Sequence, residues 1–176
     1  MASKIKVDTL ETANGSGTIA LSNQLSGMTS ASMPSGSVLQ VVSATDGNTS
    51  GSLVATTSTS YIATGLTKTI TPSSTSSKIK IDASFLTDVD TTGANIYFVI
   101  KRGSTSLGGA ANDANTGMAL VNNTRFLSGL SFSYLDSPST TSATTYELYM
   151  KSSSGGTVRY RPDESMSSLI LTEIQG

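Results

Sequence analysis

Two pairs of neighbouring carboxylates are the residues whose types and spacing come nearest to a catalytic arrangement. Asp88 and Asp90 are separated by one residue, and Asp163 is followed directly by Glu164. Two carboxyl groups on either side of a sugar bond can hydrolyse glycosides. The first pair, however, lies in a glycine-containing stretch, and aspartate is common in turns because its side chain bonds to nearby backbone. We therefore expect a turn at the first pair, and no enzyme.

The chain contains no histidine and no cysteine. Catalytic groups built on Ser-His-Asp or Cys-His are excluded, as are zinc sites with those ligands and disulfide bonds. Oxygen-rich segments occur at Asn112–Asn115 and around Asp88, but they hold too few ligands for a calcium loop such as the EF-hand, and turns explain them better. The sequence predicts no catalytic residue, no cofactor site and no metal site.

Residues 15–20 read Gly-Ser-Gly-Thr-Ile-Ala, which matches the glycine spacing of a dinucleotide-binding loop. That loop binds a cofactor only where it joins a strand to a helix. Here Gly27 follows within a few residues and interrupts any helix, so we expect a hairpin turn instead.

The composition favours β structure. Serine and threonine together make up about a third of the 176 residues, hydrophobic residues 36% and charged residues 13%. Threonine suits pleated strands, and serine and glycine suit turns. Ordinary soluble domains carry about 25% charged residues. The sequence therefore predicts an all-β protein whose weakly charged surface favours packing against other subunits.

Charge and hydropathy limit the partners. The net charge of −1 gives no electrostatic attraction for nucleic acid. The N-terminus lacks the apolar run of a signal peptide, and no stretch approaches the roughly 18 apolar residues of a membrane helix. We expect a chain made in the cytoplasm, with no nucleic-acid partner and no membrane insertion.

Residues 144–174 show the clearest two-residue alternation at the end of the chain. Gly155 and Gly156 supply the positive φ angles that a tight reversal needs. We therefore expect a hairpin followed by a terminal strand. The residues expected on the buried face of its first strand are Tyr146, Leu148 and Met150, and Val158 and Tyr160 share one face of the second strand.

Further short apolar or alternating segments occupy most of the chain from residue 36 onward. They are Val38–Val42, one or two weak strands within Ser52–Thr64, Leu66–Ile70, Lys78–Phe85, Asn95–Arg102, Met118–Val121 and Leu130–Leu135. Strands separated by turns at such spacing predict an antiparallel β-sandwich of jelly-roll type for residues 36–176. Residues 1–35 hold at most two short strands, which cannot bury a core, so we expect an extended N-terminal arm that needs a partner.

Apolar and aromatic residues on the outward positions of strands predict contact surfaces. Tyr97, Val99 and Tyr149 face outward in the expected strands, which indicates a subunit interface, although partial exposure of single residues is also common. Surface tyrosine and loop Asn or Asp are typical of sugar recognition. The candidate contacts to a surface ligand are Tyr61, Tyr134, Arg159, Tyr160 and loop 109–115 with Asn112 and Asp113.

Several runs of residues resemble small structural proteins of tailed bacteriophages, particularly those of marine bacteria and cyanobacteria. The opening Ser-Lys-Ile-Lys-Val-Asp-Thr-Leu-Glu-Thr of residues 3–12 resembles their N-termini. Residues 64–74, 102–108, 134–138 and 148–152 are similar to their C-terminal domains. The resemblance covers nearly the whole chain, but it contains no functional motif.

The resemblance implies a virion component that is a short fibre, knob or decoration protein. Such a protein is expected to be a homotrimer that contacts capsid, portal or tail proteins through its arm, with a head that contacts a host surface glycan. A capsid decoration protein and a carbohydrate-binding or carbohydrate-active module remain as alternatives. The arm residues expected to carry attachment are Ile5, Val7, Leu10, Ile19 and Leu21.

Overall fold

The computed structural model describes Gly15 and residues 33–46, 53–90, 94–108, 119–121, 126–160 and 165–176, in which all regular structure is β. These ranges contain eleven strands. They are β1 (Val38–Asp46), β2 (Val54–Thr56), β3 (Ile62–Ile70), β4 (Lys78–Val89), β5 (Asn95–Arg102), β6 (Thr105–Leu107), β7 (Ala119–Val121), β8 (Phe126–Asp136), β9 (Thr144–Ser152), β10 (Val158–Tyr160) and β11 (Ser167–Ile174).

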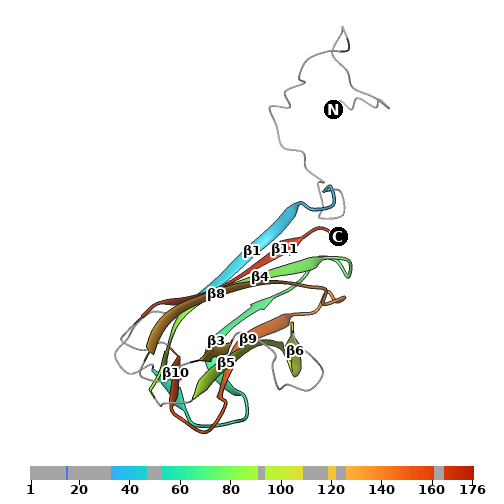
Figure 1. Cartoon of the computed structure of the whole chain (residues 1–176). Coiled ribbons are helices and arrows are strands. Elements are labelled where there is room, and N and C mark those ends of the chain that lie inside the picture. The colour runs from blue at the N-terminus through green and yellow to red at the C-terminus, as the bar shows by residue number, and fades with distance from the viewer. Residues whose placement is uncertain are drawn as a thin grey trace.

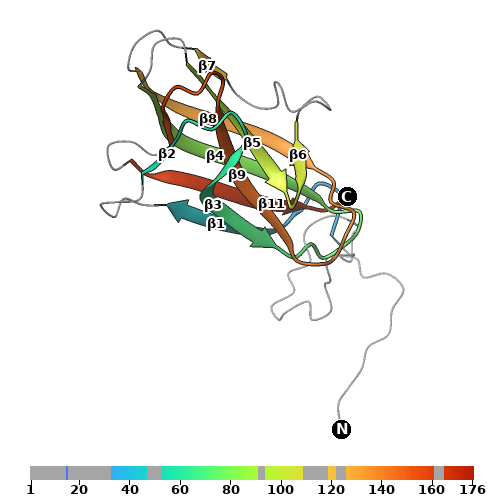
Figure 2. The ribbon, with the colours of Figure 1, turned by 90° about the horizontal axis from the view of Figure 1, so that it is seen from below.

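The strands form two antiparallel sheets that pack face to face (Figure 1). Sheet A has the order β1-β11-β4, with β8 along the other side of β4 and with β10 and β2 continuing from the second half of β4. Sheet B has the order β3-β9-β5, with β6 and β7 at the outer side of β5. Figure 2 shows the strands of sheet B running across those of sheet A at an angle. The predicted all-β sandwich is confirmed.

Consecutive long strands alternate between the sheets, as a jelly roll requires. The predicted hairpin of residues 144–161 is therefore wrong: β9 lies in sheet B, whereas β10 pairs with β2 and β4 in sheet A. The turn between them does use a positive φ, at Gly155. Sequence alternation shows which face of a strand is buried, but not which sheet the strand joins.

The predicted segments around Ile62 and at Leu66–Ile70 belong to one strand, β3. Its pairing with β9 has an irregular register between Ala63 and Thr67. Gly65 lies inside it with a φ of 85°, a conformation that glycine adopts without the clash of a side chain. An irregularity of this kind bends an edge strand, and here it joins two segments that the sequence suggested as separate strands.

The core lies between the two sheets and is built from the inward positions of both. Phe85 of sheet A packs against Phe98 of sheet B with ring centroids 4.6 Å apart, and Tyr160 lies 5.9 Å from Phe85. Both distances are in the range of favourable aromatic pairs. The predicted inward residues Tyr146, Leu148 and Met150 are completely buried, as predicted.

Glu173, near the end of β11, is completely buried where β1 begins and the chain enters β4. Its Oε1 accepts hydrogen bonds from the backbone N–H of Ser73 (2.7 Å), the Ser73 hydroxyl (2.6 Å) and the Ser77 hydroxyl (2.7 Å). Its Oε2 accepts from Nε2 of Gln40 (2.6 Å). Burial raises the pKa of Glu173, but these hydrogen bonds outweigh that effect and hold the pKa below its usual value.

The described chain enters the sandwich at this same end, where Ser37 and Gln175 lie side by side next to Glu173. We call it the near end. The Gly36 N–H donates to the carbonyl of Gln175, and the Gln175 N–H donates to the carbonyl of Ser37, each at 2.8 Å. Figure 1 shows the C-terminus beside the start of β1. The predicted arm, residues 1–35, lies outside the described residues except for Gly15 and residues 33–35, so it stays a prediction.

Candidate functional site

Tyr160 was predicted to contact a surface ligand, and this is wrong. Its side chain is fully buried and packs near Phe85, because β10 is inserted into sheet A with Val158 and Tyr160 facing the core. Arg159, between them, faces outward, where its guanidinium donates to Asp88 at 3.1 Å and to Asp90. Arg159 therefore holds the end of β4 rather than presenting a free cation.

The carboxylate pair Asp88 and Asp90 is structural. The strand β4 continues to Val89, so the turn predicted at Asp88 is wrong and Asp88 is fully buried within the strand. Both carboxylates bind the guanidinium of Arg159, and the hydrogen bond to Asp90 is the main reason that the pKa of Arg159 is raised. Arg159 therefore bridges the two carboxylates, and each has this cation as an ion-pair partner.

Several predicted site residues lie outside the described residues. They are Asp163 and Glu164, Asn112 and Asp113, and the arm residues Ile5, Val7, Leu10, Ile19 and Leu21.

The structure brings together the three residues predicted as a subunit interface. Val99 lies opposite Tyr149 in the register of β5 and β9, and Tyr97 is two residues away on the same face of sheet B. Val99, however, is only 2% exposed, so the prediction is wrong for this residue: its neighbours within the chain already cover it. Tyr97 and Tyr149 are half-buried.

Lysine side chains cover the tyrosines on this outer face of sheet B. The Lys151 ammonium lies 4.4 Å from the ring centroid of Tyr61 and 5.8 Å from that of Tyr97. The Lys101 ammonium lies 4.7 Å from the ring centroid of Tyr149 and 5.6 Å from that of Tyr61. These are cation–π distances. We call these five residues the tyrosine–lysine face.

A hollow of about 320 Å³ opens in this face between Tyr61, Lys101 and Lys151, with Thr59 and Ser60 as its other wall. Glu147 is a nearby acid, directly opposite Lys101 in the strand register. Burial, together with the charge and hydrogen bond of Glu147, raises the pKa of Tyr149, so its phenol stays neutral over the physiological range.

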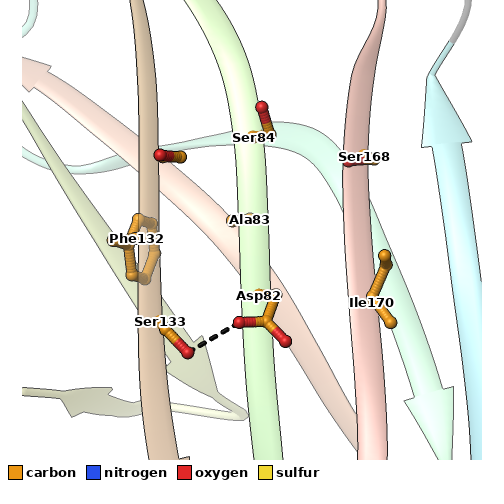
Figure 3. Close-up of a pocket in the computed structure, with 8 residues that line it drawn as sticks. Asp82, Ala83, Ser84, Phe132, Ser133, Ser168 and Ile170 are labelled. Carbon is orange, nitrogen blue, oxygen red and sulfur yellow. Dashed lines mark hydrogen bonds between the residues drawn. The ribbon is translucent and has the colours of Figure 1, made fainter.

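The outer face of sheet A has a second hollow of about 320 Å³, which Figure 3 shows across β8, β4 and β11. Its floor is made of small side chains, and Ile170 stands at one side. Asp82 accepts hydrogen bonds from Ser133 at 2.6 Å and from Lys80 at 2.8 Å. Burial raises the pKa of Asp82, but these two partners hold it below the usual value. The remaining lining residues are Ala83, Ser84, Ser131, Phe132 and Ser168.

Exposed apolar side chains occur on the strands of sheet A that carry this second hollow and on the neighbouring strand β1. They are Val38 and Val41 of β1, Leu127 and Leu135 of β8, and Ile170 of β11. The charges on this face are mostly matched within the chain, since Lys80 pairs with Asp82 and Arg159 pairs with Asp88. We call the outer side of β1, β11, β4 and β8 the sheet A face. Exposed apolar side chains that gather on one face are a common feature of interaction sites.

Sequence reasoning missed the two lysines, Ile170 and the serines of the second hollow. The alternation of β5, β9 and β11 places Lys101, Lys151 and Ile170 on outward positions, which was the available signal. Their convergence depends on which strands are neighbours, and no local pattern encodes that.

The part of the chain that the structure describes contains neither a cluster of metal ligands nor a membrane-spanning helix. No three acidic side chains there come together to hold a metal ion. The same ranges hold no helix with the length and apolar character needed to cross a membrane.

Comparisons with known proteins find a likeness among solved structures. No protein-family model matches the chain. No curated protein matches it either. Among solved structures, a chain from the structure of the infectious bursal disease virus Gx strain aligns with 12% sequence identity and a TM-score of 0.41. The alignment covers 78% of this chain and 38% of that one, so this chain spans well under half of the viral chain's length.

Proposed function

We propose that this chain is a non-enzymatic structural subunit of a virion, a short fibre or knob that assembles as a homotrimer and is attached through residues 1–35. The phage-like runs of sequence support the virion setting and the trimer. The observation that carries the assembly is the contrast between the two outer faces of the sandwich. The sheet A face is apolar with matched charges, whereas the outer face of sheet B carries the lysines.

The sheet A face has the features of a surface that another copy covers. Ile170 projects beside a hollow of small side chains, so one copy offers both a projection and a recess to its neighbour. Contacts of this head-to-tail kind close into a ring when the rotation between copies allows it. Burying Val41, Leu135 and Ile170 together would remove apolar area from water at little cost in unpaired charge.

This arrangement moves the subunit contact from the place that the sequence indicated. Tyr97 and Tyr149 are half-buried beneath lysines, and two copies meeting there would bring ammonium groups together. With sheet A turned toward the threefold axis, the tyrosine–lysine face points outward. The near end, where the chain enters the sandwich, then faces the particle.

A charge placed on the sheet A face tests the assembly. For the variant Ile170→Glu we expect the mass in solution to fall from three copies of the 18.1-kDa chain to one, because an unpaired carboxylate would be buried in the contact. Light scattering coupled to gel filtration measures the mass, and circular dichroism checks the fold. Leu53→Glu is the matched control, since Leu53 is also exposed but lies outside this face. A wild-type chain that is monomeric, or an Ile170→Glu variant that keeps the wild-type mass, would contradict the proposal.

Deletion of residues 2–33 tests the attachment. We expect the shortened chain to keep the wild-type mass and melting temperature, because the sandwich begins at β1. In particles assembled with the deleted chain as the only copy, we expect the chain to be missing from purified virions, as measured by mass spectrometry. Incorporation of the shortened chain would show that the arm is not the anchor. Loss of the trimer mass would show that the arm, rather than the sheet A face, holds the copies together.

A further inference from the structure

We infer that copies of this chain join edge to edge, with β1 of one copy adding as an antiparallel strand to β8 of the next. The inference rests on the proposed trimer and names the contact that closes it. Its evidence is the character of the two long edges of sheet A and the direction of the strands that form them. The contact adds hydrogen bonds between backbones to the apolar contact of the sheet A face.

β1 and β8 are the two long edge strands of sheet A. In the ranges that the structure describes, β1 pairs only with β11, and β8 pairs only with β4. Each strand therefore has one side on which its backbone N–H and C=O groups pair with no other described strand. A row of such groups is a template for a strand from another chain.

Neither edge carries the usual protection against such pairing. Proteins block exposed edges with charged residues, proline, bulges or very short strands. β1 has nine residues and β8 has eleven, and neither contains proline, lysine or arginine. Their acids, Asp46 and Asp136, are the last residues of the two strands, and Asp136 is buried and paired with Arg102. The register irregularity of β1 lies at its start, between Val38 and Gln40, so the rest of the strand is regular.

The edges of sheet B, in contrast, are protected. β3 has an irregular register around Gly65, and it carries Lys68 between the inward residues Leu66 and Ile70. An inward charge on an edge strand is a common block against pairing. On the outer side of β5, the strands β6 and β7 have three residues each. The contrast between the two sheets favours pairing between copies at sheet A.

The strand directions make the contact antiparallel. The strands β1, β11, β4 and β8 alternate in direction across sheet A, so β1 and β8 run in opposite directions. When copies are related by rotation about an axis roughly along these strands, β1 of each copy meets β8 of the next with opposite directions. Antiparallel pairing is slightly more stable per residue than parallel pairing. Repeated around a ring, the contact leaves neither long edge of sheet A open.

The two edges also match in level and in face. Ser43 and Ser133 lie at the two ends of one row across sheet A, on its outer face. Val41 and Leu135 end another such row, and their side chains are 58% and 55% exposed. An offset by an even number of residues keeps the same faces together, because side chains alternate along a strand. One contact thereby covers exposed apolar side chains at both edges.

Disulfide trapping tests the contact, and it is specific because the chain has no cysteine of its own. In the full chain, Ser43→Cys is combined in turn with Gly129→Cys, Ser131→Cys, Ser133→Cys or Leu135→Cys, which are outward positions of β8. Directly opposite residues of an antiparallel pair have Cα atoms about 4.5–5.5 Å apart, which a disulfide spans. After mild oxidation, we expect one of these variants to migrate in a non-reducing gel as three linked copies of the 18.1-kDa chain. Reduction should return it to one copy.

The geometry of a single copy supplies the controls. Within one copy the two edges are three strand spacings apart, or roughly 14 Å, so the disulfide forms only between copies. Ser43→Cys/Ser60→Cys is the matched control, since Ser60 is also an exposed serine but lies outside sheet A. We expect it to stay unlinked. Ser43→Cys alone and Ser133→Cys alone should also stay unlinked, because they link copies only if like edges meet.

Two results would overturn the inference. One is the absence of linkage in all four folded double variants, and the other is a dimer linked through Ser43→Cys alone or Ser133→Cys alone. Light scattering of the wild-type chain separates this outcome from failure of the proposed assembly. A wild-type trimer whose variants do not link removes only the edge contact. Linked copies with a native mass other than three chains remove only the trimer, and a monomer without linkage removes both.

Discussion

Replacing Glu173 with glutamine is expected to lower the free energy of unfolding by about 3 kcal/mol at pH 7, because a buried carboxylate with four donors becomes a neutral amide. The glutamine oxygen can still accept hydrogen bonds, but its NH₂ group would face the donors of Ser73, Ser77 or Gln40. At least one buried donor would lose its partner, and an unsatisfied buried polar group costs more than a bond gains. Urea denaturation at one fixed protein concentration measures the change.

The pH dependence of the same variant gives an independent reading. The pKa of Glu173 is lower in the folded chain than the ordinary value of 4.5, so the folded state binds a proton less readily than the unfolded state. The stability from this carboxylate is complete above pH 4.5 and is lost as the pH falls through the lowered pKa of the folded state. Wild type should therefore lose stability over this acidic window, and Glu173→Gln should lose less.

Glu147→Gln is the matched control, since it removes the same charge from a half-buried position on the outer face of sheet B. We expect a change within about 0.5 kcal/mol, as is usual for a surface substitution. If Glu173→Gln were as mild as this control, the hydrogen bonds of Glu173 would contribute nothing net. The near end would then need another explanation for its order.

Alternation in the sequence predicted which face of a strand is buried better than it predicted which strands pair with one another. Alternation placed Tyr146, Leu148 and Met150 inside, and the structure buries all three. The same alternation put Val158 and Tyr160 on one face of their strand, but that strand was expected at an edge of the sheet, with Tyr160 as a surface contact. Pairing between β10 and β4 joins residues about seventy positions apart, and only the folded chain reveals it.

The candidate site depends on long-range pairing in the same way. Tyr61, Lys101 and Lys151 come from three segments of the chain that meet only because β9 lies between β3 and β5. Each residue alone is an ordinary outward side chain, and outward residues on a sandwich are common. Composition predicted a surface that favours packing against other subunits, and this stays a prediction; the exposed Ile170 lies on a face with few charges.

Truncation of Phe98 to alanine is expected to cost about 3–5 kcal/mol of unfolding free energy, the usual cost of emptying a large buried aromatic site. Phe98 is fully buried, and its ring lies 4.6 Å from that of Phe85 across the gap between the two sheets. The cavity would open between sheets whose backbones are held by their own hydrogen bonds, so neither sheet can move in to fill it. Urea denaturation at fixed protein concentration again measures the change.

Phe132→Ala is the matched control for Phe98→Ala, because Phe132 is only partly buried and its ring lies 6.4 Å from that of Phe85. We expect a clearly smaller loss, since part of that ring is already in contact with water. Tyr160→Ala should resemble Phe98→Ala, because the ring of Tyr160 is as deeply buried and meets the same Phe85. A mild effect of Tyr160→Ala would place this tyrosine outside the core, as the sequence-based prediction of a surface contact had it. A loss of the size expected for Phe98 would mean that β10 contributes to closing the core between the sheets.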